Sequence, residues 1–283
     1  MMQHINSALT AALSDIESQA PPKLASAINH AVFPGGARIR PRLCHAVAHA
    51  AGSDCPPLVS AVATSLELLH CASLVHDDLP CFDDADTRRG LPSVHRAFGE
   101  PLAVLAGDAL IVLAFESLGR ASAKPERLPL LLAMIAESAG AARGLVAGQG
   151  WESEPEIPLA AYHQAKTGSL FVAATRGGAL AAGHDPEPWR ALGDFLGEAY
   201  QVADDLLDAC AEEAGKPLGQ DAELGRPSAV AEHGIEGAVE KLRELVDQAA
   251  ESVPSCGGAS PLRDLVRKMA ERLVPASLRQ TAA

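Results

Sequence analysis

Two aspartate-rich clusters contain the residues of this chain with the clearest chemistry. The first cluster contains Asp77, Asp78 and Asp83, and the second contains Asp204, Asp205 and Asp208. Carboxylates packed this closely repel one another, so a fold tolerates them mainly where a hard cation such as Mg²⁺, which prefers oxygen ligands, supplies the opposing charge. Arg88 and Arg89 follow the first cluster, and guanidinium groups match phosphate oxygens. The two clusters therefore predict a site for several magnesium ions and a diphosphate.

Local geometry places the two clusters on different kinds of backbone. Asp204 and Asp208 are four residues apart and share one face of a helix, whereas Asp205 is turned away by roughly 100°. Pro80 lacks an amide donor and disfavours helix in the residue before it, so we expect Asp83 in the turn that follows a helix end. Either cluster by itself is also compatible with a solvated acidic helix end, and only their combination favours the metal site.

The segment 84–89 resembles the start of a calcium-binding EF-hand loop. Arg88 and Arg89 stand where that loop needs an oxygen ligand and a glycine, so the pattern fails.

The residues 58–79 predict the helix that positions the first cluster. At 100° per residue, His70 lies on the same stripe as Asp77, while Ser73, Leu69 and Ala72 occupy an adjacent arc. One face thus carries metal ligands at its end and small or apolar groups below them. The alternative is that these small and apolar residues are ordinary helix core.

Composition predicts one all-α domain spanning residues 1–283. Of the 283 residues, 48% are hydrophobic but only 4% are aromatic, which points to a core of Leu, Ala and Val as in closely packed helices. Proline- and glycine-rich turns divide the chain into a series of helices, with no repeat and no strand–helix alternation. A net charge of −13 argues against nucleic-acid and anionic-membrane partners.

The cysteines and the apolar segments indicate a cytoplasmic protein. The six cysteines form no Cys-x-x-Cys pair, which favours reduced thiols over disulfides or zinc ligands. The first twenty residues lack the continuous apolar segment of a signal peptide. The longest apolar stretch, 102–115, contains Asp108 and is shorter than the roughly 20 residues of a membrane span. We therefore expect no membrane span.

A set of basic residues stands at helix ends or glycine-rich turns, where backbone amides can help to bind anions. Its members are Arg38, Arg40, Arg88, Arg89, Lys166, Lys216 and Arg226. Each alone is compatible with an ordinary surface charge, but together they suit an anionic substrate.

In combination, these motifs resemble those of the trans-prenyltransferases, the short-chain isoprenyl diphosphate synthases, over residues 33–228. The motifs are Gly-Gly-x-Arg-x-Arg-Pro at 35–41, the aspartate-rich segment 70–83, Arg88-Arg89-Gly90, Lys166-Thr167-Gly168, Gln201-x-x-Asp204-Asp205-x-x-Asp208, and Gly215-Lys216 with Gly219-x-Asp221. More narrowly, 33–41, 71–80 and 161–168 look like the geranylgeranyl diphosphate synthases of carotenoid and bacteriochlorophyll pathways in phototrophic bacteria.

The resemblance implies an isoprenoid synthase fold of about ten or more helices around a central cavity, usually as a homodimer. It implies condensation of allylic diphosphates with isopentenyl diphosphate, with geranylgeranyl diphosphate as the product. Three magnesium ions are implied, bound by Asp77, Asp83 and Asp204 and supported by Asp78 and Asp208.

The resemblance also assigns roles to residues outside the two aspartate clusters. The residues implied to bind the allylic diphosphate are Arg88, Lys166 and Lys216, and those implied to bind isopentenyl diphosphate are Arg40, His70 and Arg89. The residues implied to face the allylic cation are Lys166, Thr167 and Gln201. The residues implied to set the product length are Ala72 and Ser73.

Three positions depart from the usual family pattern. Ala37 and Arg226 stand where lysine is usual, and Glu152 replaces a common aspartate. Arg226 keeps the charge but changes its reach. The alternatives are a farnesyl diphosphate synthase of the same family, or a non-catalytic regulatory subunit of a heteromeric prenyl synthase. A class I terpene cyclase fits less well, because Arg89 and the segment 35–41 serve a second diphosphate.

Overall fold

The structure is a computed structural model that describes residues 1–33, 35–121, 123–209 and 228–271. Almost all regular structure in these residues is helical, which confirms the predicted all-α class. Lys216 and Arg226, with the motif at 215–221, lie outside the described residues.

Two compact units make up the chain. The first comprises residues 1–48, 53–135 and 177–184, and the second comprises 49–52, 136–176 and 185–283. The expectation of one domain over residues 1–283 stays a prediction.

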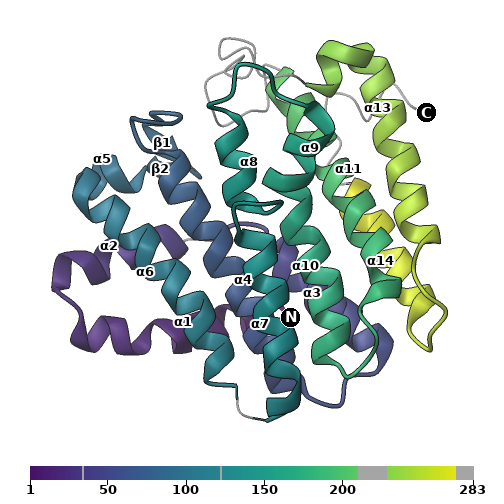
Figure 1. Cartoon of the computed structure of the whole chain (residues 1–283), viewed down its shortest axis with the longest axis horizontal. Helices are drawn as coiled ribbons and strands as arrows, with labels where there is room; N and C mark the ends of the chain where they lie inside the picture. The colour runs from purple at the N-terminus through teal and green to yellow at the C-terminus, as the bar shows by residue number, and fades with distance from the viewer. Residues whose placement is uncertain (34, 122, 210–227, 272–283) are drawn as a thin grey trace. The chain divides into compact units, whose positions relative to one another are not determined.

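The first unit is built around one long buried helix. Its helices are α1 (Met2–Gln19), α2 (Pro22–Val32), most of α3 (Ile39–Ala51), α4 (Pro56–Asp77), α5 (Val94–Phe98), α6 (Glu100–Gly119), the 3₁₀ turn Pro125–Arg127 and most of α7 (Leu128–Ala139) (Figure 1). The core of the unit is α4, which packs against α1, α2 and α6 and is buried on nearly every side. Its first residue is a proline, whose missing amide hydrogen has no helical partner at that position.

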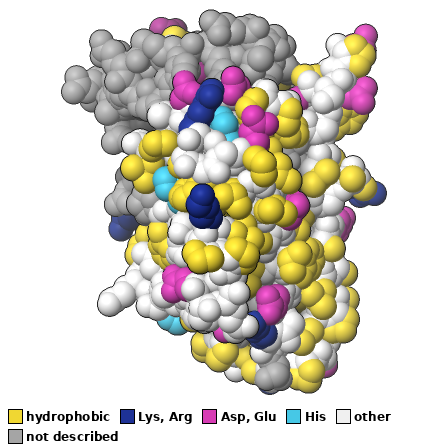
Figure 2. Space-filling view, turned by 90° about the vertical axis from the view of Figure 1, so that its left-hand side faces the viewer, with side chains coloured by type: hydrophobic (Ala, Val, Ile, Leu, Met, Phe, Trp, Pro, Cys, Tyr) yellow, Lys and Arg dark blue, Asp and Glu magenta, His cyan; other side chains and the backbone are white. Residues whose placement is uncertain are grey.

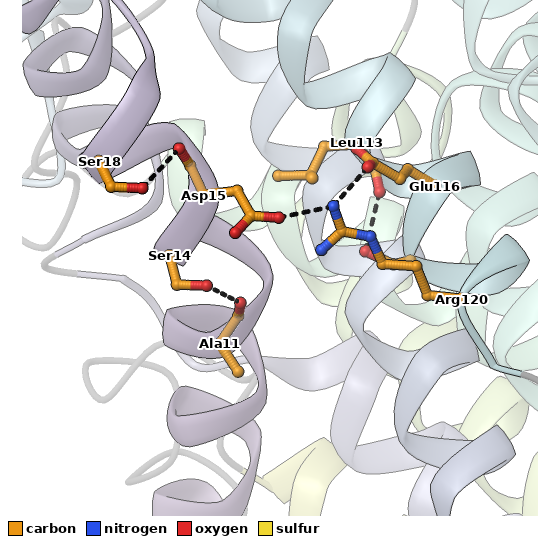
Figure 3. A network of polar contacts seen from close by, with 8 residues as sticks. Ala11, Ser14, Asp15, Ser18, Leu113, Glu116 and Arg120 are labelled. Atoms are coloured by element: carbon orange, nitrogen blue, oxygen red, sulfur yellow. Dashed lines mark hydrogen bonds and ion pairs between the residues drawn. The ribbon is translucent and has the colours of Figure 1, made fainter.

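A polar contact joins α1 to α6 in the first unit. Figure 3 shows Arg120, just past the end of α6, between Asp15 on α1 and Glu116 on α6. The guanidinium donates to Asp15 Oδ2 at 2.8 Å and to Glu116 Oε1 at 2.6 Å. All three side chains are exposed, so water and salt screen the pairs and they add little stability.

Two helices, α4 and α6, have the length and apolar composition of membrane-spanning helices. In α4, 78% of the apolar window is buried inside the protein, as in the core helix of a soluble fold, against 39% in α6. With its flanking residues, α6 extends to 20 residues, beyond the apolar stretch 102–115. The length of α6 therefore does not decide whether this helix spans a membrane, and the absence of a membrane span stays a prediction.

The second unit contains the other elements of the described residues. They are α8 (Leu145–Trp151), α9 (Leu159–His163), the π-helical turn Gln164–Gly168, most of α10 (Ser169–Ala181), the 3₁₀ turn Glu187–Trp189, α11 (Arg190–Ala209), α13 (Ala229–Glu251) and α14 (Ala259–Glu271). A core of small and aliphatic side chains, including Ala203, Leu206 and Leu242, joins α11 to α13. Ser228 caps α13 by accepting a hydrogen bond from the amide of Ala231 at 3.1 Å.

Candidate active site

The first aspartate motif lies where α4 ends. The helix ends at Asp77, three residues before Pro80, as the constraint on residues that precede proline predicts. In the turn that follows, the amide of Asp83 donates to the carbonyl oxygen of Asp77 at 2.9 Å. Asp77 is 7% exposed and Asp83 is half-buried. The turn thus folds Asp83 back to the last residue of the helix, which confirms its predicted place.

Asp78 binds an arginine within the same motif. Nε of Arg88 donates to both carboxylate oxygens of Asp78, at 3.0 and 3.2 Å, and Nη2 donates to Oδ1. Asp78 is only 2% exposed. Burial by itself lowers the pKa of Arg88, but the hydrogen bond to Asp78 and the negative charges of Asp78, Asp77 and Asp83 raise that pKa overall. Asp78 therefore orients Arg88 beside the other two aspartates.

The two further acidic residues of this loop, Asp84 and Asp86, pair with a residue that sequence reasoning missed. Arg96 on α5 contacts Asp84 at 3.1 Å and Asp86 at 2.6 Å. Both aspartates are exposed. Arg96 thus balances the excess charge of the loop and ties it to α5.

The paired arginines lie on a two-stranded hairpin that the sequence analysis did not predict. Strands β1 (Thr87–Arg88) and β2 (Leu91–Pro92) pair antiparallel around a turn formed by Arg89 and Gly90. Both turn residues have positive φ, 54° and 78°, as a type I′ turn requires. Arg89 is therefore held at the exposed tip. Its guanidinium packs against Gly36, because a β-carbon on Gly36 would lie only 2.9 Å from Cζ of Arg89.

Four arginines surround His70, which lies on α4 seven residues before Asp77. Burial lowers the pKa of His70 well below its ordinary value, and the positive charges of Arg40, Arg89, Arg88 and Arg38 lower it further. His70 is therefore a neutral hydrogen-bonding group near neutral pH. The first unit thus brings the charges of Arg40 and Arg89 close enough to act on His70, on the helix that ends at Asp77, and these residues form an electropositive cluster.

The second aspartate motif lies near the end of α11 in the second unit. Asp204 is exposed and Asp208 is half-buried. Asp205 is only 4% exposed and accepts hydrogen bonds from Nε2 of Gln201 at 2.9 Å and from the amide of Ala229 at 2.7 Å. The predicted helix is confirmed, and Asp205 joins α11 to the start of α13.

The Lys166-Thr167-Gly168 motif lies in the π-helical turn Gln164–Gly168, a distortion common at functional sites. Oγ1 of Thr167 donates to Oε1 of Gln201 at 2.8 Å. Two of the predicted residues therefore meet, and the chain of hydrogen bonds continues from Gln201 to Asp205. Asp205 fixes the orientation of Gln201, a role that sequence reasoning missed.

Glu152 balances the charge of Lys166. Its Oε1 accepts hydrogen bonds from Nζ of Lys166 at 2.5 Å and from the hydroxyl of Tyr162 at 2.6 Å. Nζ of Lys166 also lies 5.7 Å from the centre of the Tyr162 ring. The departure from aspartate at position 152 thus supplies a longer carboxylate that reaches both groups.

The two predicted chain-length residues are buried within α4. Ala72 is 1% exposed, and the hydroxyl of Ser73 donates to the carbonyl oxygen of His70 at 2.8 Å. Both residues lie on the last two turns of the helix that ends at Asp77.

Both motifs carry carboxylates of the kind that magnesium prefers. Asp77 and Asp83 are joined through the backbone of one turn, and carboxylates are the ligands that Mg²⁺ prefers. Within the described part of the chain, no group of three or more His, Cys, Asp or Glu side chains is arranged to hold a metal ion.

Comparison with known proteins agrees with these features. The polyprenyl synthetase family model matches residues 21–258. The geranylgeranyl diphosphate synthase of Cereibacter sphaeroides is 56% identical over 280 residues, covering 98% of this chain and 97% of the relative. That of Rhodobacter capsulatus is 52% identical and covers 97% of both chains.

Among solved structures, the geranyltransferase of Helicobacter pylori, complexed with magnesium and isoprenyl diphosphate, is similar with a TM-score of 0.79 and 27% identity. The match covers 95% of this chain and 96% of that structure.

Proposed function

We propose, since this chain belongs to the polyprenyl synthetase family, that it condenses allylic diphosphates with isopentenyl diphosphate and makes geranylgeranyl diphosphate. One observation carries the proposal: two geranylgeranyl diphosphate synthases share more than half of their residues with this chain over nearly its whole length. The test incubates purified protein with Mg²⁺, isopentenyl diphosphate and each of dimethylallyl, geranyl and farnesyl diphosphate, and then sizes the products. Absence of any condensation product would reject the proposal.

Carboxylates from both motifs would hold the magnesium ions. We assign Asp77, Asp83 and Asp204 as ligands of three ions, with Asp208 beside Asp204 and with Asp78 acting through Arg88. Bound magnesium supplies positive charge that stabilises the departing diphosphate. Arg88, Lys166 and Lys216 add positive charge for the same leaving group.

The electropositive cluster around His70 suits the second substrate. Arg40, His70 and Arg89 bind the diphosphate of isopentenyl diphosphate, and neutral His70 donates one hydrogen bond without adding charge. The Thr167 hydroxyl, the Lys166 carbonyl and Gln201 face the allylic carbon that becomes positive when its bond to diphosphate breaks. The double bond of isopentenyl diphosphate then forms the new carbon–carbon bond, and a proton leaves to the released diphosphate. The chain contributes positioning and electrostatics without a protein nucleophile.

Retention of both aspartate motifs favours an enzyme over a regulatory subunit. Product sizing separates geranylgeranyl from farnesyl diphosphate synthesis. We also propose a cytoplasmic location, from the pattern of the cysteines, and a supply of product to carotenoid-type pathways, from the resemblance of segments 33–41, 71–80 and 161–168.

The exposed face of α6 supports a homodimer. Val104, Leu105 and Val112 are exposed on one face of this helix, and Val112 is 66% exposed. Figure 2, which views the protein from the side where α5 and α6 lie in Figure 1, shows apolar side chains over much of the surface. Asp108 is exposed on the same face, between Val104 and Val112. Exposed apolar side chains gathered on one helix face commonly mark a protein interface. A second copy of this chain is the occupant that we propose.

Val112→Glu is therefore expected to convert a dimer into monomers, because burying one carboxylate per subunit without a partner opposes association. Light scattering after size exclusion in detergent-free buffer measures the mass, which for wild type should be about twice 29.3 kDa. Ile235→Glu, at an exposed apolar residue of α13, is the matched control and should stay dimeric. A monomeric wild type, or one that floats with lipid vesicles, would contradict the proposal.

Ala37 offers a test of the isopentenyl diphosphate site. This exposed residue follows Gly36, on which Arg89 packs, and the family usually has lysine here. Ala37→Lys should lower the KM for isopentenyl diphosphate several-fold, roughly the effect of one exposed charge contact, with little change in kcat. Steady-state kinetics measure both, with Ala37→Gln as an uncharged control of similar length. An unchanged KM would show that position 37 does not contact the substrate.

A further inference from the structure

Arg38 differs from the other arginines of the electropositive cluster because it is enclosed. Only 3% of the residue is exposed. Nη1 donates to Oε1 of Glu67 at 2.5 Å, and Nη2 donates to the carbonyl oxygen of Val32 at 2.7 Å. The guanidinium also lies 5.8 Å from the centre of the Phe33 ring. A side chain held on three sides in this way is not available to a diphosphate.

The loop before α3 is shaped around this guanidinium. Arg38 has a φ of 49°, in the left-handed region that only a few residues other than glycine adopt. Gly35 has a φ of 81°, and a β-carbon there would lie 2.6 Å from Nη2 of Arg38. The neighbouring Gly36 makes the corresponding space for Arg89. The loop therefore packs Arg38 on one glycine and the substrate-facing Arg89 on the next.

The partner of Arg38 lies on the helix that carries the site. Glu67 is 1% exposed on α4, three residues before His70 and ten before Asp77. The carbonyl of Arg38 accepts the amide of Arg42 at 3.1 Å, so Arg38 directly precedes α3, whose second residue is Arg40. The pair thus fastens the start of α3 to α4 at the level of His70.

The contact with Glu67 also gives Arg38 a positioning role, which differs from the substrate-binding role proposed for Arg40 and Arg89. Glu67 pairs with Arg38 and leaves that side chain only 1% exposed, whereas the side chain of Arg88, which pairs with Asp78, stays 19% exposed. Arg40 and Arg89 are the arginines that we assign to isopentenyl diphosphate above. We infer that Arg38 and Glu67 form a buried positioning pair that places Arg40 and the 35–40 loop for isopentenyl diphosphate, while neither residue contacts substrate.

This inference rests on the proposed prenyltransferase function and adds two positioning residues to it. The pair acts only on the isopentenyl diphosphate side, so its loss should raise the KM for isopentenyl diphosphate about tenfold and leave the KM for farnesyl diphosphate and kcat within about twofold.

Removing one partner of a buried ion pair leaves an unpaired charge and destabilises the fold, whereas replacing both by apolar residues is often neutral. The informative variant is therefore the double substitution Arg38→Met with Glu67→Leu, compared with Arg38→Lys, Glu67→Gln and wild type. Arg38→Lys retains the charge next to Glu67 but loses the fork that reaches Val32 as well. Arg120→Gln, which breaks an exposed arginine–carboxylate contact in the same unit, is the matched control.

Thermal unfolding of each protein is recorded first, and KM values for both substrates are then measured on every variant that unfolds cooperatively. A raised KM for isopentenyl diphosphate alone, in the double variant and to a smaller degree in Arg38→Lys, supports the inference. A wild-type KM for isopentenyl diphosphate in the folded double variant, or in folded Arg38→Lys, overturns the inference, since the pair would then be purely structural. Equal loss on both substrates also overturns it. Failure of the proposed function is distinct, because wild-type protein would then form no product.

Discussion

Replacing Asp77, Asp83 or Asp204 by alanine is expected to lower kcat about a thousandfold while leaving the helical fold intact. Loss of one metal contact to a developing negative charge removes about 4 kcal/mol of transition-state stabilisation, which equals this factor in rate. In the protein without metal the same change relieves repulsion between carboxylates, so thermal stability should be unchanged or raised. Steady-state turnover at several Mg²⁺ concentrations and thermal unfolding measure the two effects.

The matched control is Asp247→Ala, an exposed aspartate on α13 that contacts Arg267 only at 3.9 Å. It should leave kcat unchanged. Removal of Mg²⁺ by a chelator should abolish turnover in wild type, and added Mg²⁺ should restore it. Near-normal turnover in any of the three variants at moderate Mg²⁺ would show that its carboxylate is not a ligand.

The second large expected effect is a change of product. Ala72→Phe should shift the product from geranylgeranyl to farnesyl diphosphate, because a ring at this position fills space that the growing chain needs. Ala72 and Ser73 lie about 7.5 and 6 Å from Asp77 along the axis of α4. We propose that the growing prenyl chain extends along this side of the helix. Ala72 is buried, so the added ring costs about 1–3 kcal/mol of stability where packing is tight.

Product sizing after extraction measures this effect, with thermal unfolding recorded alongside. Ala72→Ser changes the volume little and should keep geranylgeranyl diphosphate as the main product. An active Ala72→Phe enzyme that still makes mostly geranylgeranyl diphosphate would show that other residues set the length. A wild type that stops at farnesyl diphosphate would refute the product assignment and leave the family unaffected.

Local features of the sequence were enough to place both aspartate motifs on the correct backbone. The helical period puts Asp204 and Asp208 on one face and Asp205 on another, and the steric effect of Pro80 ends α4 before Asp83. These predictions succeeded because they depend on residues within one or two turns. The all-α class followed in the same way from apolar composition and turn residues. The hairpin was missed because its turn uses Arg89 at positive φ, where asparagine, aspartate or glycine is usual.

The tertiary structure alone decided which of several similar charges is already paired. Arg38 and Arg40 are only two residues apart in the sequence. Glu67, which is 29 residues away from Arg38, accepts its hydrogen bond from Arg38. Asp78 is hydrogen-bonded to Arg88, and Lys166 is hydrogen-bonded to Glu152. Asp205 accepts hydrogen bonds from Gln201 and from the amide of Ala229. A sequence shows the number of charges but not their partners, because partners form through long-range packing. Burial makes the Arg38–Glu67 pair hard to separate, whereas the side chains of Arg88 and Lys166 stay partly exposed, so the fold decides which of these charges can meet a substrate.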